Sequence, residues 1–167
     1  MQLRPERPAD RAAVEAVHRV AFPTDDEALL VAALRESDAF VPALSIVAEA
    51  DGRVVGHVLF TEVTVDGTDA ALTLAPVAVH PDRQGEGIGS RLIRHGLDSC
   101  RDAGYDLVVL HGDPEFYSRF GFEPATPHGL THPFDLPDEA FQVRWLVDDV
   151  AGRIGGPVGY DAAFERL

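Results

Sequence analysis

The sequence predicts a single domain of the α/β class, with α+β character because an antiparallel meander precedes its one βαβ unit. Three features predict this fold. Two helical segments begin the chain, three strands joined by short Asp-Gly turns follow, and a strand, a glycine-rich loop, a helix and a buried strand come next. The 167 residues are enough for one well-formed core, so we expect one domain over 1–167.

Apolar residues at helical spacing indicate the two N-terminal helices. They recur over Ala9–Phe22 and predict the first helix. Pro23 breaks this pattern, and Thr24 or Asp25 provides an N-cap for a second helix that runs through Leu34.

The meander is predicted over Leu44–Glu49, Val54–Val65 and Ala71–Val79. The dipeptides at 51–52 and 66–67 are both Asp-Gly, which favours tight hairpin turns. Consecutive strands that are joined in this way pair antiparallel.

A parallel unit follows the meander. Ile88–Ala103 is predicted to be an amphipathic helix, and its apolar stripe includes Cys100, which we therefore interpret as a core residue. Asp106–Leu110 is a short, mostly apolar strand of the kind found at the centre of a sheet. These elements and the strand before them form one βαβ unit, which should be right-handed with parallel strands.

The last third of the chain is less regular. We expect a short helix over Pro114–Arg119, a strand near Phe122, a loop over Pro124–Pro137 and a strand over Phe141–Val147. The sheet then has about six to seven strands, flanked by about four helices. The tail over 152–167 is glycine-rich at first, and its aromatic side chains would add to a homodimer interface.

The charge balance is strongly acidic. Acidic residues number 28 and basic residues 14, all of them arginine, so the net charge is −14. This balance argues against nucleic acid and anionic membrane as partners, because phosphate neutralisation needs clustered cations. It would steer a cationic substrate to the surface, but we favour adaptation to high salt or a composition bias, which also explains the absence of lysine.

Other bulk features favour a cytoplasmic protein. The single cysteine leaves no internal disulfide, and the charged N-terminus precedes no apolar signal segment. No apolar run approaches the roughly 20 residues of a membrane helix.

The segment Gln84–Ser90 carries the strongest functional signal. Glycines at 85, 87 and 89 let the backbone approach a ligand closely, and the loop opens directly into the predicted helix. The first N–H groups of a helix lack intrahelical partners and its dipole favours an anion, so this segment is a predicted pyrophosphate site. Glu86 lies inside the loop, which indicates that backbone amides bind the anion.

Two other phosphate-binding classes fit the sequence poorly. A P-loop requires a lysine, which the chain lacks. A dinucleotide-binding unit requires an acidic residue after its second strand, whereas Asp106 comes too early and Asp113 falls in a Gly-Asp-Pro turn. A glycine-rich turn that merely begins a helix is a simpler alternative, and the motifs around the loop argue against it.

Over Leu74–Ala125 the sequence resembles the GNAT N-acetyltransferase superfamily. The family pattern Gln/Arg-x-x-Gly-x-Gly/Ala is met by Gln84, Gly87 and Gly89, and the run Phe116–Ala125 is similar to the family's Tyr-x-x-x-Gly-Phe block. Within the superfamily the chain resembles the YhbS-type predicted acetyltransferases, through its Gly-Asp-Pro turn and its Phe-Gly-Phe-Glu-Pro-Ala run.

The resemblance implies a GNAT-like mixed sheet that is splayed at its centre, between the strand over 71–79 and the strand over 106–111. Acetyl-CoA, as a co-substrate, would lie in this gap with its pantetheine along the first of these strands. The implied cofactor-binding residues are Val77, Ala78, Val79, Gln84, Gly85, Glu86, Gly87, Ile88, Gly89 and Ser90, with Arg119 as a further candidate for a CoA phosphate.

The resemblance also implies a reaction. A primary amine, on a small molecule or a protein, would attack the thioester directly in a ternary complex, without an acyl-enzyme. Tyr117 matches the family tyrosine that protonates the departing thiolate, and a donor suits this step because a thiol with a pKa of about 8.5 leaves as an anion. The structural alternative for Tyr117 is packing among phenylalanines, and the functional alternative for the chain is an acyl-CoA-binding sensor without turnover.

The general base is left open among Glu62, His57 and His111. Histidine suits the pH range, and the odd spacing of residues 57 and 62 places them on opposite faces of an unbulged strand. At most one of these two residues then faces the cleft.

A loose group of polar residues follows in the predicted loop, namely His128, His132 and Asp135. Their spacing is irregular and no cysteine accompanies them, so we expect no metal site. We expect them instead to line the acceptor pocket or to lie in solvent.

Overall fold

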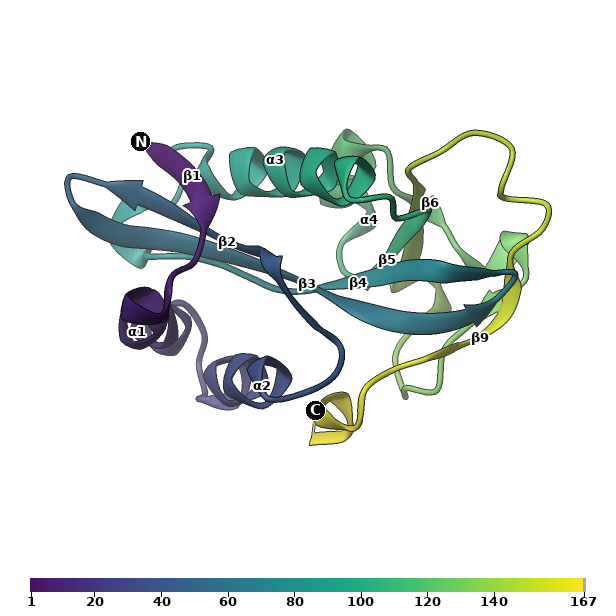
Figure 1. Ribbon diagram of the computed structural model, residues 1–167, viewed down its shortest axis with the longest axis horizontal. Coiled ribbons are helices and arrows are strands. Elements are labelled where there is room, and N and C mark those ends of the chain that lie inside the picture. Colours follow the sequence, from purple (N-terminus) through teal and green to yellow (C-terminus); the bar gives the residue numbers. More distant parts are fainter. Residues whose placement is uncertain (167) are drawn as a thin grey trace.

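Helices cover both faces of one sheet in the computed structural model, which describes residues 1–166 (Figure 1). The helix α3 (Ile88–Asp102) lies on one face, and α1 (Arg11–Ala21) and α2 (Asp26–Arg35) lie on the other. A one-turn helix, α4 (Pro114–Tyr117), comes after the βαβ unit. The four α-helices and the mixed sheet confirm the predicted fold class. Along the described chain, no helix is both long enough and apolar enough to cross a membrane.

The strands are β1 (Gln2–Pro5), β2 (Phe40–Ala50), β3 (Arg53–Asp66), β4 (Thr68–Val79), β5 (Leu107–His111), β6 (Glu123–Pro124), β7 (Leu130–Thr131), β8 (Phe141–Trp145) and β9 (Gly155–Gly159). Their order in the sheet is β1-β2-β3-β4-β5-β8-β6, and β9 pairs with both β3 and β7. Short 3-10 helices occupy Pro8–Asp10, Pro81–Arg83, Ser118–Phe120, Thr126–His128, Asp138–Ala140 and Ala162–Arg166. The meander β2–β4 is antiparallel, and β4 pairs with β5 in parallel, as predicted.

Strands β1, β7 and β9 were not predicted from the sequence. The buried residue of β1 is the charged Arg4, whose burial is compensated by ion pairs with Asp10 at 2.7 Å and Glu49 at 3.4 Å. Because this inward position is charged, no apolar alternation marks the strand. The strand β9 has the sequence Gly-Gly-Pro-Val-Gly, and β7 has only two residues. Their pairing depends on distant contacts and leaves no local pattern.

The sheet opens between β4 and β5. The two strands pair only from Ala71, opposite Leu107, to Thr73, opposite Val109. Beyond this point β4 continues to Val79 while still paired with β3, but it has no paired strand on its other side among the described residues. The splay that the resemblance implied is therefore present, and it leaves one edge of β4 open.

The local predictions within the βαβ unit and the meander are also confirmed. The turn between β2 and β3 has positive φ angles of 53° at Asp51 and 74° at Gly52, as expected of an Asp-Gly hairpin. On α3 the apolar stripe faces the sheet and Cys100 is fully buried, so the interpretation of that residue as part of the core is confirmed. Burial also raises the pKa of its thiol, so this cysteine stays protonated and inert.

The C-terminal tail packs on its own chain. Phe164 is only 3% exposed and lies in the cluster that contains Leu30 and Leu34 of α2. The ring of Tyr160 lies 4.7 Å from that of Phe134. Both tail aromatics are therefore used within the chain, which removes the reason for assigning them to a homodimer interface. Leu167 lies outside the described residues.

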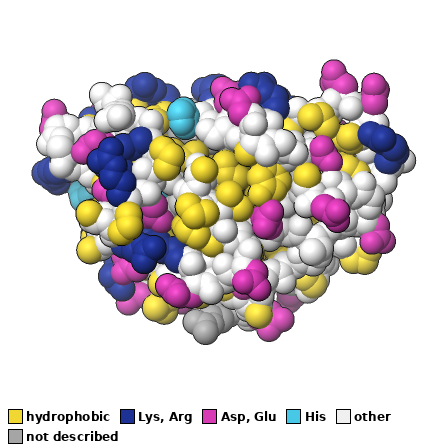
Figure 2. Space-filling model, in the orientation of Figure 1, with side chains coloured by type: hydrophobic (Ala, Val, Ile, Leu, Met, Phe, Trp, Pro, Cys, Tyr) yellow, Lys and Arg dark blue, Asp and Glu magenta, His cyan; other side chains and the backbone are white. Residues whose placement is uncertain are grey.

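Acidic side chains are scattered over the face of the molecule drawn in Figure 2 and do not gather in one patch. Arginine side chains lie among them, and hydrophobic side chains gather near the middle of this face. On this face, therefore, the negative charge is dispersed, as expected for solubility in salt.

Candidate active site

The loop between β4 and α3 is shaped by two glycines in the left-handed region. Gly85 and Gly87 both have φ of 80°, and Gly87 is the N-cap of α3. A Cβ atom built on either glycine would meet no atom within 4 Å. Glycine is therefore required here by the backbone conformation and not by close packing.

Backbone N–H groups of this loop are free to bind an anion. Within the described chain, those of Gly85, Glu86 and Gly87 donate to no carbonyl or side chain. The next three, in the first turn of α3, lack intrahelical acceptors because of their position. The N–H of Gln84 is engaged only by a long bond of 3.5 Å to Pro81. The geometry thus supports the predicted pyrophosphate site.

Side-chain charges within the loop neutralise each other. Arg83 Nε lies 3.1 and 3.2 Å from the two carboxylate oxygens of Glu86. This pairing keeps the Glu86 carboxylate beside a cation, so it need not repel a phosphate from the amides.

The open edge of β4 presents main-chain groups at alternate residues. The N–H of His80 donates to Val55 of β3 at 2.8 Å, so the N–H and C=O groups of Val79 and Val77 point away from β3. The carbonyl of Val79 already accepts a 3.1 Å bond from Gln84 Nε2. A pantetheine chain that lies along this edge would therefore find the groups of Val77 and the N–H of Val79.

Tyr117 stands at the end of α4, against the end of β5. Its ring packs edge-on to Phe116 and Phe122, with centroids 5.0 and 5.8 Å apart. It also covers Gly112, where an added Cβ would collide with the ring. Burial raises the pKa of its phenol, so the hydroxyl keeps its proton and can donate it. Both expectations for Tyr117, aromatic packing and a proton donor, are compatible with this position.

A cavity of about 370 Å³ lies where the sheet opens. It is lined by Thr73, Leu74, Ala75, His111, Phe134, Asp135, Leu136, Tyr160 and Phe164. The three residues of β4 are separated from Val77 only by Pro76, so the cavity adjoins the open edge. Asp135 lines this cavity and is also exposed to solvent, whereas no pattern in the sequence placed Tyr160 or Phe164 there.

His111 brings an imidazole into this cavity from the end of β5. Its ring stacks on Phe141 at 4.9 Å and stands edge-on to His132 at 4.5 Å. Its Nε2 atom is buried without a hydrogen-bond partner among the described residues. Burial, and to a smaller degree His132, lowers the pKa of His111 to about 4, so the ring is neutral at physiological pH.

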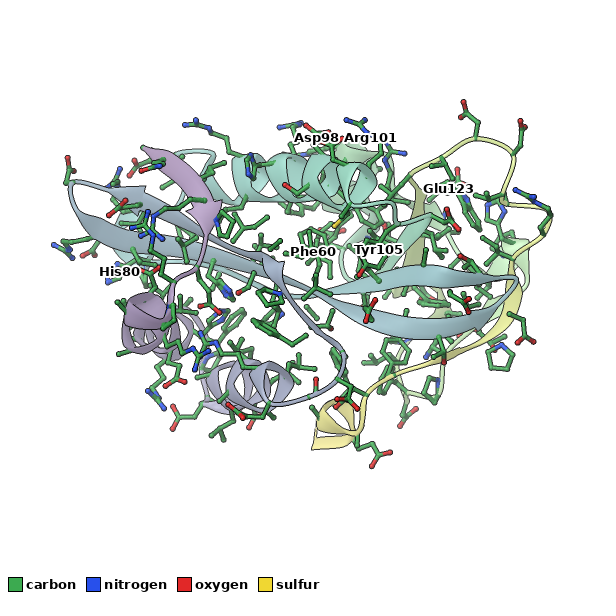
Figure 3. The ribbon with its side chains drawn as sticks, in the orientation of Figure 1. Phe60, His80, Asp98, Arg101, Tyr105 and Glu123 are labelled. Atoms are coloured by element: carbon green, nitrogen blue, oxygen red, sulfur yellow. The ribbon has the colours of Figure 1, made fainter. Side chains whose placement is uncertain are left out.

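The two other candidate bases lie elsewhere. Glu62 accepts a 2.8 Å bond from the hydroxyl of Tyr105, which follows α3; Figure 3 shows Tyr105 beside Phe60 between α3 and the sheet. His57 is fully buried on the α1 side, bonded to His18 and to Ser45 at 2.8 Å each. Residues 57 and 62 therefore do face opposite sides of β3, and neither lines the cavity.

The remaining polar candidates have partners of their own. His128 Nε2 lies 2.7 Å from Glu123, and His132 Nε2 lies 3.2 Å from Asp138. In the described part of the chain, no three His, Cys, Asp or Glu side chains gather as a metal site would require. The Arg119 guanidinium lies over the ring of Phe116 at 5.5 Å, and its contact with a CoA phosphate stays a prediction.

An open strand edge that leads from a glycine loop to a cavity defines an enzyme of the acyl-CoA-using class. The chain matches a family model described as an acetyltransferase (GNAT) domain over residues 2–125. It is 40% identical to the uncharacterized N-acetyltransferase YhbS of Escherichia coli (strain K12), over 100% of both chains. It is also 39% identical to the uncharacterized N-acetyltransferase YjhQ of the same strain, over 87% of this chain and 82% of that one.

Solved structures agree with the sequence relatives. YhbS from Escherichia coli, crystallised in complex with CoA, matches with a TM-score of 0.94 at 40% identity, over 99% of this chain and 92% of that one. A GNAT family acetyltransferase from Brucella melitensis, in complex with acetyl-CoA, matches with a TM-score of 0.80 at 38% identity, over 98% and 97% of the two chains. The chain therefore belongs to the GNAT acetyltransferase family, which confirms the predicted resemblance and the prediction of an acyl-CoA-dependent N-acetyltransferase.

Proposed function

We propose that the protein transfers the acetyl group of acetyl-CoA to a primary amine that binds in the cavity at the open edge of β4. The observation that carries this proposal is the continuity of three parts: the loop with free N–H groups, the open edge at Val77 and Val79, and the cavity that holds His111. The CoA and acetyl-CoA complexes of the two similar structures support the same donor.

The donor would lie along β4 with its pyrophosphate on the amides of the glycine loop. This placement brings the thioester toward Leu74 and Ala75, where β4 enters the cavity lining. An amine in the cavity would then meet the carbonyl carbon directly. No protein nucleophile is required, and the buried Cys100 is not available as one.

His111 and Tyr117 would move the two protons. Along β5, Leu107 and Val109 pack into one core cluster, and Leu110 packs into the cluster that also contacts Tyr117. His111 is two residues after Val109 and therefore points to the same face of the sheet as Val109. The imidazole of His111 and the phenol of Tyr117 thus lie on opposite faces of the sheet at the end of β5. The amine nitrogen becomes acidic as its bond to carbon forms, so neutral His111 can take its proton while Tyr117 protonates the thiolate.

A location in the cytoplasm is part of this proposal, because the lone and buried Cys100 gives no disulfide. The homodimer stays a prediction. The tail aromatics do not support it, because they pack within the chain.

Steady-state kinetics test the direct transfer. With acetyl-CoA and an accepted amine varied together, double-reciprocal lines should intersect, because both substrates must be bound before reaction. The mass of the protein should not change after incubation with acetyl-CoA alone. Parallel lines with an acetylated protein would overturn direct attack, and tight acetyl-CoA binding without turnover of any amine would identify a sensor instead of an enzyme.

A further inference from the structure

Four aromatic rings form one wall of the cavity, and each ring stands edge-on to the next one in the row. His111 meets Phe134 at 5.7 Å, Phe134 meets Tyr160 at 4.7 Å, and Tyr160 meets Phe164 at 5.5 Å, with interplanar angles of 83°, 63° and 67°. Edge-to-face contacts hold each ring in place and leave ring faces for a ligand. Leu74 and Leu136 add further apolar surface to the lining.

Few polar groups interrupt this wall. Thr73 Oγ1 already donates to the carbonyl of Val109 at 3.0 Å. The hydroxyl of Tyr160, like His111 Nε2, is buried without a partner among the described residues. A ligand rich in hydroxyl groups would leave most of them unpaired here, at a large cost in desolvation.

The mouth of the cavity is acidic. Asp135 is exposed at its rim, and it also lines a neighbouring groove that shares Phe134, Tyr160 and Phe164 with the cavity and adds Asp161 and Glu165. No arginine side chain lines the cavity or this groove in the described chain. A cation is therefore attracted to the opening and a carboxylate is repelled.

We propose that the acceptor is a small arylalkylamine, a primary amine on a short alkyl chain that ends in an aromatic ring. In water such an amine is mostly an ammonium ion, which releases one proton to solvent before it attacks the thioester as the neutral amine. Asp135 and the ring faces attract the ammonium cation, while the aromatic ring of the ligand packs against the apolar wall of the cavity. A volume of about 370 Å³ suits a small molecule. The inference rests on the proposed function, since it assigns the substrate class of the same site.

The C-terminal quarter of the chain supplies the residues that select the acceptor. The wall residues Phe134, Asp135, Tyr160 and Phe164 all follow residue 125, where the match to the family model ends. The matched segment supplies the loop, β4 and β5. Acceptor selection is therefore separated along the sequence from donor binding.

The test compares acceptors and variants by kcat/KM at saturating acetyl-CoA. Phenethylamine should exceed glucosamine, glycine and spermidine by about tenfold or more, since these lack an aromatic body and the first two carry unpaired hydroxyls or a carboxylate. Asp135→Asn should lower kcat/KM for phenethylamine about two- to fivefold, mainly through KM. Glu139→Gln is the matched control, because it removes an exposed charge from the same region without lining the cavity, and it should leave the value unchanged.

A second variant tests the aromatic wall. Phe134→Leu keeps an apolar wall but removes the ring, so the preference for phenethylamine over hexylamine should shrink about threefold to tenfold. Two results would overturn the arylalkylamine assignment while leaving the acetyltransferase activity intact. One is a kcat/KM for glucosamine or spermidine above that for phenethylamine, and the other is an equal change of kcat/KM for phenethylamine in D135N and E139Q. Acetyl-CoA binding without acetylation of any amine would overturn both proposals.

Discussion

The hydroxyl of Tyr105 donates to the carboxylate of Glu62 over 2.8 Å, and this contact holds Glu62 away from the cavity that His111 lines. Burial and the Glu62 carboxylate together raise the pKa of Tyr105, so its hydroxyl remains a donor at all physiological pH values. Two candidate bases that the sequence could not rank therefore have different surroundings. Glu62 has a structural partner, and His111 has a buried ring nitrogen without one.

The first prediction separates these two residues. His111→Gln should lower kcat about 100-fold or more, because the attacking amine loses its proton acceptor. Glu62→Gln keeps an acceptor for Tyr105 and should change kcat less than about threefold. Stopped assays with product detection by mass spectrometry give both values. The assignment is wrong if E62Q is the more impaired variant.

Tyr117→Phe should lower kcat about 100-fold while leaving the dissociation constant of acetyl-CoA unchanged. The phenylalanine ring keeps the contacts with Phe116 and Phe122, so the fold is preserved. Titration calorimetry and circular dichroism provide these controls. A turnover number equal to that of the unmodified protein would reduce Tyr117 to a packing role.

Gly87→Ala should weaken acetyl-CoA binding about tenfold, because the strained residue displaces loop amides and loses at least one charge-assisted hydrogen bond. Gly104→Ala is the matched control. Gly104 also has positive φ, 93°, with open space around it, but it lies past the far end of α3. Both variants should lose about 1 to 2 kcal/mol of stability in urea unfolding. Equal dissociation constants in the two variants would contradict the loop assignment.

The stability of the protein should fall in acid because of the buried pair His18 and His57. Burial lowers the pKa of His18 from 6.5 to about 4 and that of His57 well below 6.5. Both rings are neutral in the fold, whereas the unfolded chain binds protons below pH 6.5. The free energy of unfolding therefore falls as the pH drops below 6.5, by up to about 1.4 kcal/mol per pH unit for each histidine that stays neutral in the fold, and for His18 this range ends at a pH of about 4.

Urea unfolding at several pH values checks this slope. His18→Gln should lower the slope of the unfolding free energy against pH by an amount that corresponds to about one bound proton. His95→Gln, on the exposed side of α3, should leave this slope unchanged. A stability that stays constant from pH 7 to pH 5 would show that these histidines do not remain neutral in the fold.

The features that were predicted from the sequence are those encoded within a few residues. The Asp51-Gly52 turn requires positive φ at both of its residues, the second Asp-Gly turn requires it at Gly67, and the glycine loop requires it at Gly85 and Gly87. The apolar stripe of α3 repeats at helical spacing, so its buried face could be assigned directly.

The acceptor cavity could not be predicted in the same way. Its wall joins Thr73 and His111 to Phe134 and Tyr160, which are far apart in the sequence and meet only after the tail folds back. The strand β9 in that tail is glycine-rich and carries no alternation. The ranking of the bases also depended on tertiary contacts, since the bonds of Glu62 and His57 come from distant elements.

The donor site between the glycine loop and the cavity can be seen in a crystal structure of the protein with CoA bound, through the positions of the pyrophosphate and the sulfur. We predict the pyrophosphate on the amides of Gly85 to Ser90, the pantetheine amides on Val77 and the N–H of Val79, and the sulfur between Tyr117 and the cavity that holds His111. A pyrophosphate away from this loop would show that its amides do not bind the donor, and a sulfur beside Glu62 would show that His111 does not serve the reaction.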